Sequence, residues 1–262
     1  EESLRQKPLQ GRVGIGHTRW ATHGKPSERN AHPHRARSVV IVHNGIIENY
    51  RELRAELEAA GAQMNSDTDT ELIAHLIEGR IQAGRDLLTA TREACARLEG
   101  SYAFGALCEK APGQLVAAKN GGSPIIIGQS EKNAFLASDI PAILPYTREI
   151  ISLFDGDFAL LSEDGIEVVD IEGRLLEREF QNVQWDPVSA EKSGYDHFMK
   201  KEIFEQPRAI TDTIGTRASE LDLDIDLDGI TFTKSEVEGL RGISLVACGT
   251  AYYACMVGKY MI

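Results

Sequence analysis

The chain has 262 residues, enough for one large domain or one and a half ordinary ones. Its hydrophobic content of 42% and charged content of 26% are typical of a soluble globular protein. The net charge of −12 argues against a general binder of nucleic acid, and no apolar run reaches the roughly 18 residues that a membrane span needs.

The cysteines have spacings that fit neither a disulfide framework nor a zinc site: Cys95, Cys108, Cys248 and Cys255. Few, scattered cysteines are typical of a reducing compartment, so we expect a cytoplasmic protein. The chain starts without a Met and without the basic and apolar regions of a signal peptide, and it stops inside an apolar run. We therefore expect both ends to be cut.

Residues 11–21 and 38–43 have the apolar pattern of strands. Three helices are predicted next. The first covers residues 49–60, the second begins after a capping box at Thr68–Glu71, and the third runs from Leu87 to Leu98.

From residue 101 the pattern changes to short apolar runs separated by Pro-Gly, Gly-Gly and Asp-Gly, which are typical of strands and turns. Asp155-Gly156 is predicted to be a hairpin turn. Strands on both sides of the three helices favour an α+β fold in which sheets pack against helices. The predicted strands are 101–109, 114–120, 124–128, 133–138, 149–154, 157–162, 165–171 and 174–180.

Residues 181–194 are polar and have no periodicity, so we place a domain boundary there. Beyond it the pattern predicts a helix over 195–216, interrupted at Pro207, and a short helix over 234–241. Residues 243–250 predict a buried strand that runs into a small-residue turn and an apolar helix. This order is typical of the opening of an α/β domain for nucleotides or sugar phosphates.

The stretch Gly14–Gly24 is bracketed by glycines and packs polar side chains into few positions. The guanidinium of Arg19 can fork onto a carboxylate, and Thr18, Thr22 and His23 add donors and acceptors. We interpret this stretch as a loop that grips a small polar substrate carrying a carboxylate. An ordinary surface loop with an ion pair is the alternative.

Two further motifs each allow a structural and a functional interpretation. Asn44-Gly45 follows a buried strand and is either a type I′ hairpin turn or a pair of donors for an oxyanion hole. Asp69 is either a helix-capping carboxylate or a ligand for a substrate ammonium group. Together, Arg19 and Asp69 would hold the two charged ends of a free amino acid.

His32-Pro33-His34 has the spacing of a metal-binding pair, but no Cys or carboxylate cluster adjoins it, so we expect no metal site and no cofactor. The chain has no Gly-x-Ser-x-Gly elbow, no phosphate-binding P-loop, and no cysteine or serine beside a base in these loops. A site with substrate grips and an oxyanion hole is incomplete without a nucleophile, which we expect to lie before Glu1.

Motifs in four places resemble those of the glutamine–fructose-6-phosphate aminotransferase family, at residues 16–24, 30–34, 43–49 and 66–71. Residues 201–207 are similar to the segment that opens the isomerase domain of that family, and 247–250 to its first sugar-phosphate-binding turn. The resemblance covers nearly the whole chain in order.

This resemblance implies an N-terminal-nucleophile hydrolase-type fold, a four-layer αββα sandwich, over residues 1–182. A linker at 183–194 and the beginning of an α/β sugar isomerase (SIS) domain at 195–262 would follow. In the implied reaction, an N-terminal cysteine attacks the glutamine amide, and ammonia passes to fructose 6-phosphate to give glucosamine 6-phosphate and glutamate. The partners would be glutamine and fructose 6-phosphate, in an enzyme that is a homodimer.

Carried over motif by motif, the resemblance implies that Arg19 binds the α-carboxylate of glutamine and Asp69 binds its α-ammonium group. Asn44 and the Gly45 N–H would form the oxyanion hole. Thr22 and His23 would line the Arg19 loop, and Trp20 would lie at the mouth of an ammonia channel. Gly249 and Thr250 would contact the sugar phosphate, although Ala251 replaces a serine that some members carry. Because the nucleophilic cysteine is not in this chain, we expect the chain to be inactive alone.

Two other functions remain open at this point. The chain could belong to another class II glutamine amidotransferase, such as amidophosphoribosyltransferase or asparagine synthetase. It could also be a non-catalytic sensor of a sugar phosphate or an amino acid that keeps the fold.

Overall fold

The computed structural model describes residues 11–19, 27–184, 195–214 and 233–261, and it divides the chain into two compact units, Glu1–Glu191 and Lys192–Ile262. The division lies inside the linker predicted at 183–194. Val183, at the start of that linker, is buried with Ile126 and Ile150. The packing of the first unit therefore extends one residue past its predicted end at 182.

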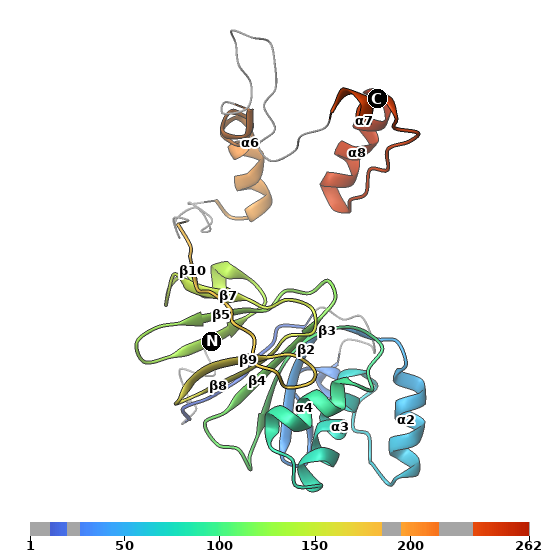
Figure 1. Ribbon diagram of the computed structural model, residues 1–262, viewed down its shortest axis with the longest axis vertical. Helices are drawn as coiled ribbons and strands as arrows, with labels where there is room; N and C mark the ends of the chain where they lie inside the picture. Colours follow the sequence, from blue (N-terminus) through green and yellow to red (C-terminus); the bar gives the residue numbers. More distant parts are fainter. Residues whose placement is uncertain (1–10, 20–26, 185–194, 215–232, 262) are drawn as a thin grey trace. The chain divides into compact units, whose positions relative to one another are not determined.

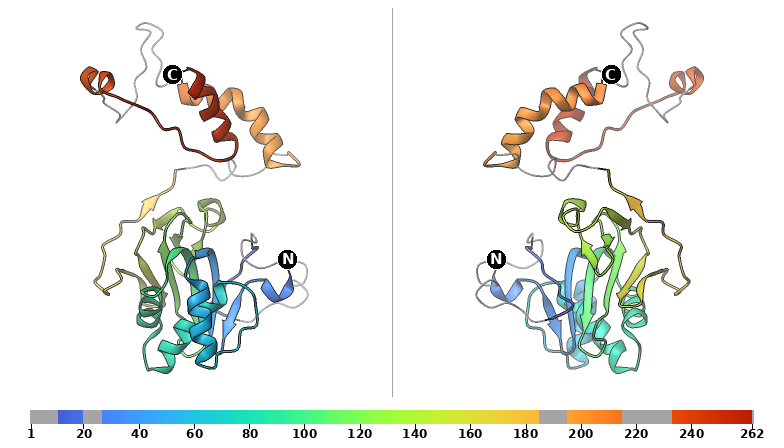
Figure 2. Two further views of the ribbon diagram at one scale, coloured as in Figure 1. Left: turned by 90° about the vertical axis from the view of Figure 1, so that its right-hand side faces the viewer. Right: turned by 90° about the vertical axis from the view of Figure 1, so that its left-hand side faces the viewer.

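Two antiparallel sheets form the frame of the first unit (Figure 1). The larger sheet has six strands in the order β1 (His34–Ala36), β2 (Val39–Ile47), β3 (Gly100–Cys108), β4 (Leu115–Asn120), β8 (Phe158–Ser162) and β9 (Gly165–Val169). The smaller sheet has four, in the order β10 (Gln181–Asn182), β7 (Glu149–Ser152), β5 (Ile126–Gln129) and β6 (Ala134–Ala137). A short 3-10 helix, η1 (Glu28–Asn30), precedes β1, which lies at the edge of the six-stranded sheet beside β2 (Figure 2).

Side chains alternate between the two faces of the six-stranded sheet, as the period of two in a strand requires. Phe104 and Phe158 belong to the core that faces the helices α2 (Tyr50–Ala59), α3 (Thr70–Gln82) and α4 (Leu87–Cys95). Ala103 and Ala159, one position along each strand, belong to the core that faces the second sheet. In Figure 1 the helices, the six-stranded sheet and the four-stranded sheet follow one another as layers.

The α+β architecture of two sheets packed with helices is confirmed, but the described residues of the first unit form three of the four predicted layers. The outer side of the four-stranded sheet is covered by the short 3-10 helix η2 (Ile140–Ala142) and the residues after it. Ile143 and Leu144 pack there against Ile126 and Ile150. Strands of four residues leave a small face, and one turn of helix covers it.

The strand predicted over 11–21 is wrong for its described part, because residues 11–19 form no strand. Glycines at 11, 14 and 16 provide no side chains that would pack on a pleated surface. Ile15 still packs, half-buried, against the core between the two sheets. The apolar pattern therefore identified a packed segment but not its backbone conformation.

Two predictions near the end of the first unit are also wrong. Asp155-Gly156 makes a turn, with Gly156 at φ +83°, but it joins β7 of one sheet to β8 of the other and forms no hairpin. A turn motif reports the local backbone and not which strands pair. The strand predicted at 174–180 is reduced to an isolated bridge between Val169 and Leu175.

The second unit contributes the helices α6 (Phe198–Ile214), α7 (Lys234–Glu238) and α8 (Gly249–Met261). Pro207 lies inside α6 and does not interrupt it, and the Thr211 hydroxyl donates to the Pro207 carbonyl at 2.9 Å. The strand predicted at 243–250 is wrong, because residues 241–248 are irregular and Val246 is 89% exposed. A strand needs a neighbouring strand that forms hydrogen bonds with its backbone groups. The described residues of this unit include no strand.

Candidate functional site

Asn44 and Gly45 lie inside β2, so they do not form the alternative hairpin turn. Strand β2 continues four residues past its predicted end and pairs with β3, with Asn44 opposite Ala103 and Gly45 opposite Tyr102. Gly45 has φ +140°, and a Cβ atom there would lie 2.2 Å from the carbonyl oxygen of Ser101. Only glycine fits this position.

Asp69 immediately precedes α3, but its carboxylate does not cap the helix. Its Oδ2 accepts a hydrogen bond of 2.9 Å from the N–H of Ile47 at the end of β2, and the residue is 3% exposed. The interpretation of Asp69 as a helix cap is therefore wrong, because tertiary contact turns its carboxylate toward β2. The capping box predicted at Thr68–Glu71 is wrong as well, because the Thr68 hydroxyl lies 3.0 Å from the Ser66 hydroxyl and 3.1 Å from His34 Nε2.

Glu71, the other acidic residue of the predicted box, closes the preceding loop. Its carboxylate accepts from the N–H of Asn65 at 2.7 Å, the N–H of Ser66 at 2.6 Å and the Ser66 hydroxyl at 2.7 Å. Burial raises the pKa of Glu71, but the hydrogen bonds from His75, Ser66 and Asn65 together outweigh it and hold the pKa at about 2. This buried carboxylate shapes the loop that carries Thr68 and Asp69.

Glu71→Gln is expected to destabilise the chain by roughly 3 kcal/mol at pH 7, because the pKa of Glu71 falls from 4.5 to about 2 on folding. The carboxylate contributes stability above pH 4.5, which is lost as the pH falls toward 2. The difference between wild type and variant should therefore shrink between pH 5 and pH 3 in urea unfolding experiments. Glu109→Gln, at an exposed pair with Arg35, is the matched control and should change little at either pH. An equal loss for Glu71→Gln at both pH values would contradict the assignment.

One cavity of about 340 Å³ collects the described residues of the predicted amino-acid site. Arg19 reaches it from the N-terminal segment, Asn44 and Gly45 from β2, and Asp69 from the start of α3. The guanidinium and carboxylate residues proposed for the two ends of an amino acid therefore line the same space. The remaining lining residues are His17, His32, His43, Ile46, Thr68, Thr70, Ser101 and Ser123.

The remaining predicted site residues are Trp20, Thr22, His23, Gly249 and Thr250. Trp20, Thr22 and His23 lie outside the described residues. Gly249 and Thr250 begin α8 in the second unit, where Gly249 has φ +61° and both residues are exposed. Their contact with a sugar phosphate stays a prediction.

A group of histidines is the part of the site that sequence reasoning did not assemble. The rings of His17 and His32 lie 4.4 Å apart, and those of His32 and His34 lie 4.9 Å apart. The Thr70 hydroxyl lies 3.0 Å from His43 Nδ1 and 3.2 Å from His32 Nε2. The sequence feature that could have predicted this group is the presence of four histidines in or beside the loops of the proposed site.

Burial keeps two of these rings neutral at pH 7. Burial, followed by the neighbouring His17, lowers the pKa of His32 to about 3. Burial also lowers the pKa of His43 to about 4, although the Asp69 carboxylate opposes this shift. These imidazoles can therefore exchange hydrogen bonds with hydroxyls without adding positive charge.

Comparison with known proteins identifies the family. The family described as glutamine amidotransferase domain matches residues 17–145, which include Arg19, Asn44, Gly45 and Asp69. The chain belongs to the glutamine amidotransferases. It is 48% identical over 264 residues to the glutamine–fructose-6-phosphate aminotransferase [isomerizing] of Clostridium tetani, covering 100% of this chain and 43% of that protein. It is also 48% identical over 253 residues to that of Symbiobacterium thermophilum, covering 96% of this chain and 41% of that protein.

These relatives confirm the resemblance drawn from the motifs, and the similarity continues through the second unit. The chain spans 43% of the length of the Clostridium tetani relative. Among solved structures, the glutamine phosphoribosylpyrophosphate amidotransferase of B. subtilis matches with a TM-score of 0.50 and 24% identity, covering 61% of this chain and 35% of that chain. That match shows a shared fold of the N-terminal-nucleophile amidotransferase type.

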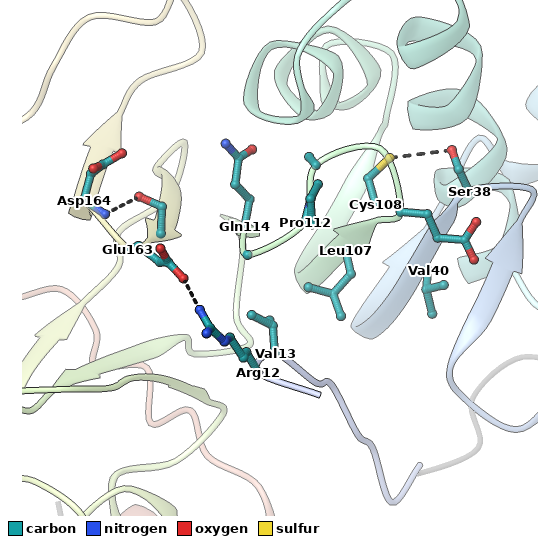
Figure 3. A pocket seen from close by; sticks show the side chains of 14 residues that line it. Arg12, Val13, Ser38, Val40, Leu107, Cys108, Pro112, Gln114, Glu163 and Asp164 are labelled. Atoms are coloured by element: carbon teal, nitrogen blue, oxygen red, sulfur yellow. Dashed lines mark hydrogen bonds and ion pairs between the residues drawn. The ribbon is translucent and has the colours of Figure 1, made fainter. Parts of the chain in front are cut away.

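A second cavity in this amidotransferase, of about 700 Å³, lies at the start of β2 and the end of β3, away from the candidate site (Figure 3). Arg12 and Glu163 form an exposed ion pair of 3.0 Å there, and the Cys108 sulfur lies 3.6 Å from the Ser38 hydroxyl. None of the predicted site residues within the described ranges lines it. Within the described ranges, no group of three or more His, Cys, Asp or Glu could hold a metal ion, and no helix is long and apolar enough to cross a membrane.

Proposed function

We propose that this chain is the glutamine-hydrolysing part, with the opening of the isomerase part, of a glutamine–fructose-6-phosphate aminotransferase. The enzyme releases ammonia from glutamine and transfers it to fructose 6-phosphate, giving glutamate and glucosamine 6-phosphate. The observation that supports this most directly is that Arg19 and Asp69 line the same cavity as Asn44 and Gly45. A cytoplasmic location and a homodimeric enzyme are part of the proposal.

The cavity suits the zwitterion of glutamine. The Arg19 guanidinium forks onto the α-carboxylate, and the buried Asp69 carboxylate binds the α-ammonium group. Asp69 keeps one oxygen on the Ile47 N–H, which leaves its other oxygen for the substrate. Held at both ends, the substrate turns its side-chain amide toward Asn44 and Gly45.

The backbone of β2 supports a role for the Gly45 N–H in the oxyanion hole. Strand β1 begins at His34, which pairs with Ile41, so the part of β2 after Ile41 has no residue of β1 on that edge. The N–H groups alternate in direction along a strand, and the Gly45 N–H therefore faces the same edge as the Ile47 N–H that Asp69 accepts. A donor fixed in a strand stabilises a developing oxyanion without reorganising.

The nucleophile is a cysteine supplied from outside the described residues. Cys95 and Cys108 are buried and do not line the cavity, and burial raises the pKa of the Cys95 thiol. Trp20, Thr22 and His23 complete the glutamine loop. Gly249 and Thr250 bind the sugar phosphate.

Product analysis of the natural protein that carries this sequence tests the proposal. Glutamine with fructose 6-phosphate should yield glutamate and glucosamine 6-phosphate, whereas phosphoribosyl pyrophosphate should not accept the ammonia. The 262-residue chain alone should bind glutamine in calorimetry and release no glutamate. Binding without hydrolysis by the natural protein would favour a sensor, and transfer to another acceptor would favour another amidotransferase.

A further inference from the structure

We propose that His17 is a positioning residue that holds the Asn44 side-chain amide with its N–H donor turned into the substrate cavity. The inference rests on the proposed function and deepens it, because it assigns a role to a residue outside the predicted oxyanion hole. The His17 ring makes two hydrogen bonds, one at each of its nitrogens.

The first hydrogen bond determines the tautomer of His17. The backbone N–H of Arg19 donates to His17 Nδ1 at 2.8 Å. A backbone N–H only donates, so Nδ1 must be the unprotonated nitrogen, and the ring hydrogen is carried by Nε2. Arg19 lies at φ +44°, a left-handed conformation that is uncommon for a residue with a side chain. This backbone conformation accompanies the close approach of the Arg19 N–H to the ring two residues earlier.

The second hydrogen bond, together with this tautomer, determines the orientation of the Asn44 amide. His17 Nε2 lies 2.7 Å from Asn44 Oδ1, so Nε2–H donates and Oδ1 accepts. The reversed amide would place its NH₂ group against the Nε2–H, two donors facing each other. His17 therefore selects one of the two orientations of the Asn44 amide.

The selected orientation is the one that an oxyanion hole needs. With Oδ1 on His17, the Nδ2 donor of Asn44 lies on the opposite side of the planar amide. No hydrogen bond from Nδ2 is found within the described part of the chain, and Asn44 lines the cavity. Because both ring nitrogens of His17 are engaged, this imidazole has no lone pair for proton transfer with a substrate. Its contribution acts through Asn44.

A double-mutant cycle in the natural protein tests this inference through glutamine hydrolysis. Asn44→Ala should lower kcat by about 100- to 1000-fold, the usual effect of removing one oxyanion donor. His17→Ala should lower kcat by about 10-fold and leave KM for glutamine within about 2-fold, because the donor acts in the transition state. The double variant should be no slower than Asn44→Ala. His17→Gln, whose amide NH₂ can reach the place of Nε2–H, should recover most of the activity.

The outcomes separate the inference from the proposed function. If Asn44→Ala lowers kcat and the His17 effect persists in full in the double variant, the inference is overturned and the proposed function stands. An unchanged kcat in Asn44→Ala would overturn the oxyanion hole itself. A loss that His17→Gln does not recover, with a lower melting temperature, would assign His17 a structural role and also overturn the inference. If His17→Ala does not fold, the cycle is run with His17→Gln and His17→Leu.

Discussion

Arg19→Ala is expected to lower kcat/KM for glutamine by about 100- to 1000-fold, mainly through a higher KM. In the proposed site, the guanidinium pairs with the α-carboxylate in the ground state and in the transition state alike. Its loss therefore weakens the binding of both states equally. Truncating one partner of a hydrogen-bonded charge pair in a partly enclosed site costs about 2–5 kcal/mol. Steady-state kinetics of glutamate release by the natural protein measures the effect.

Arg19→Lys is the matched variant for this prediction. It keeps the positive charge but not the planar fork, so it should fall between wild type and Arg19→Ala. A modified substrate identifies the group that Arg19 binds: with the α-carboxylate of glutamine blocked as an amide, wild type and Arg19→Ala should perform alike. If the blocked substrate still distinguishes the two proteins by the full factor, Arg19 does not bind the carboxylate.

Gly45→Ala is expected to destabilise the first unit by about 2–5 kcal/mol. A Cβ atom at this position would lie 2.2 Å from the Ser101 carbonyl oxygen and 2.9 Å from His43 Nε2, inside the pairing of β2 with β3. The conformation at φ +140° is also one that residues with a side chain rarely adopt. Strain in the backbone and overpacking each cost about 1–3 kcal/mol. Urea unfolding followed by far-UV circular dichroism measures the change.

Gly84→Ala is the control for the backbone contribution. Gly84 also has a positive φ, of +87°, but a Cβ atom there would meet nothing within 4 Å. Its replacement should cost only about 1 kcal/mol, and the difference between the two variants isolates the contact with Ser101. Equal destabilisation of the two variants would show that β2 relaxes away from Ser101 without penalty.

Local patterns predicted most of the elements of the first unit. Apolar side chains at helical spacing located α2, α3 and α4, and short apolar runs located the strands from β3 to β9. Patterns failed where the outcome depended on a distant partner. Asn44-Gly45 has the composition of a hairpin turn, yet β3 pairs with it and extends β2. Thr68–Glu71 has the composition of a capping box, yet its two carboxylates bind Ile47 and the 65–66 backbone.

The candidate site likewise has a part that the sequence predicted and a part that it did not. Arg19, Asn44, Gly45 and Asp69 could be selected from their chemistry and from resemblance to a family, and the described residues bring them to one cavity. The spacing of residues in the sequence did not predict that His17 lies between the Arg19 backbone and the Asn44 amide. A hydrogen bond between residues 27 positions apart depends on how two segments pack, and no local pattern reports that.

The amino-acid sequence by itself determined the residue types that we propose for binding a charged amino acid, most of the helices and strands that carry them, and the relationship to glutamine amidotransferases. Only the tertiary structure decided which sheet each strand joins, that Asp69 turns to β2, and how the Asn44 amide is oriented. The physical reason is that periodicity records which face of an element is apolar, whereas pairing and orientation depend on donors and acceptors contributed by segments far away in the chain.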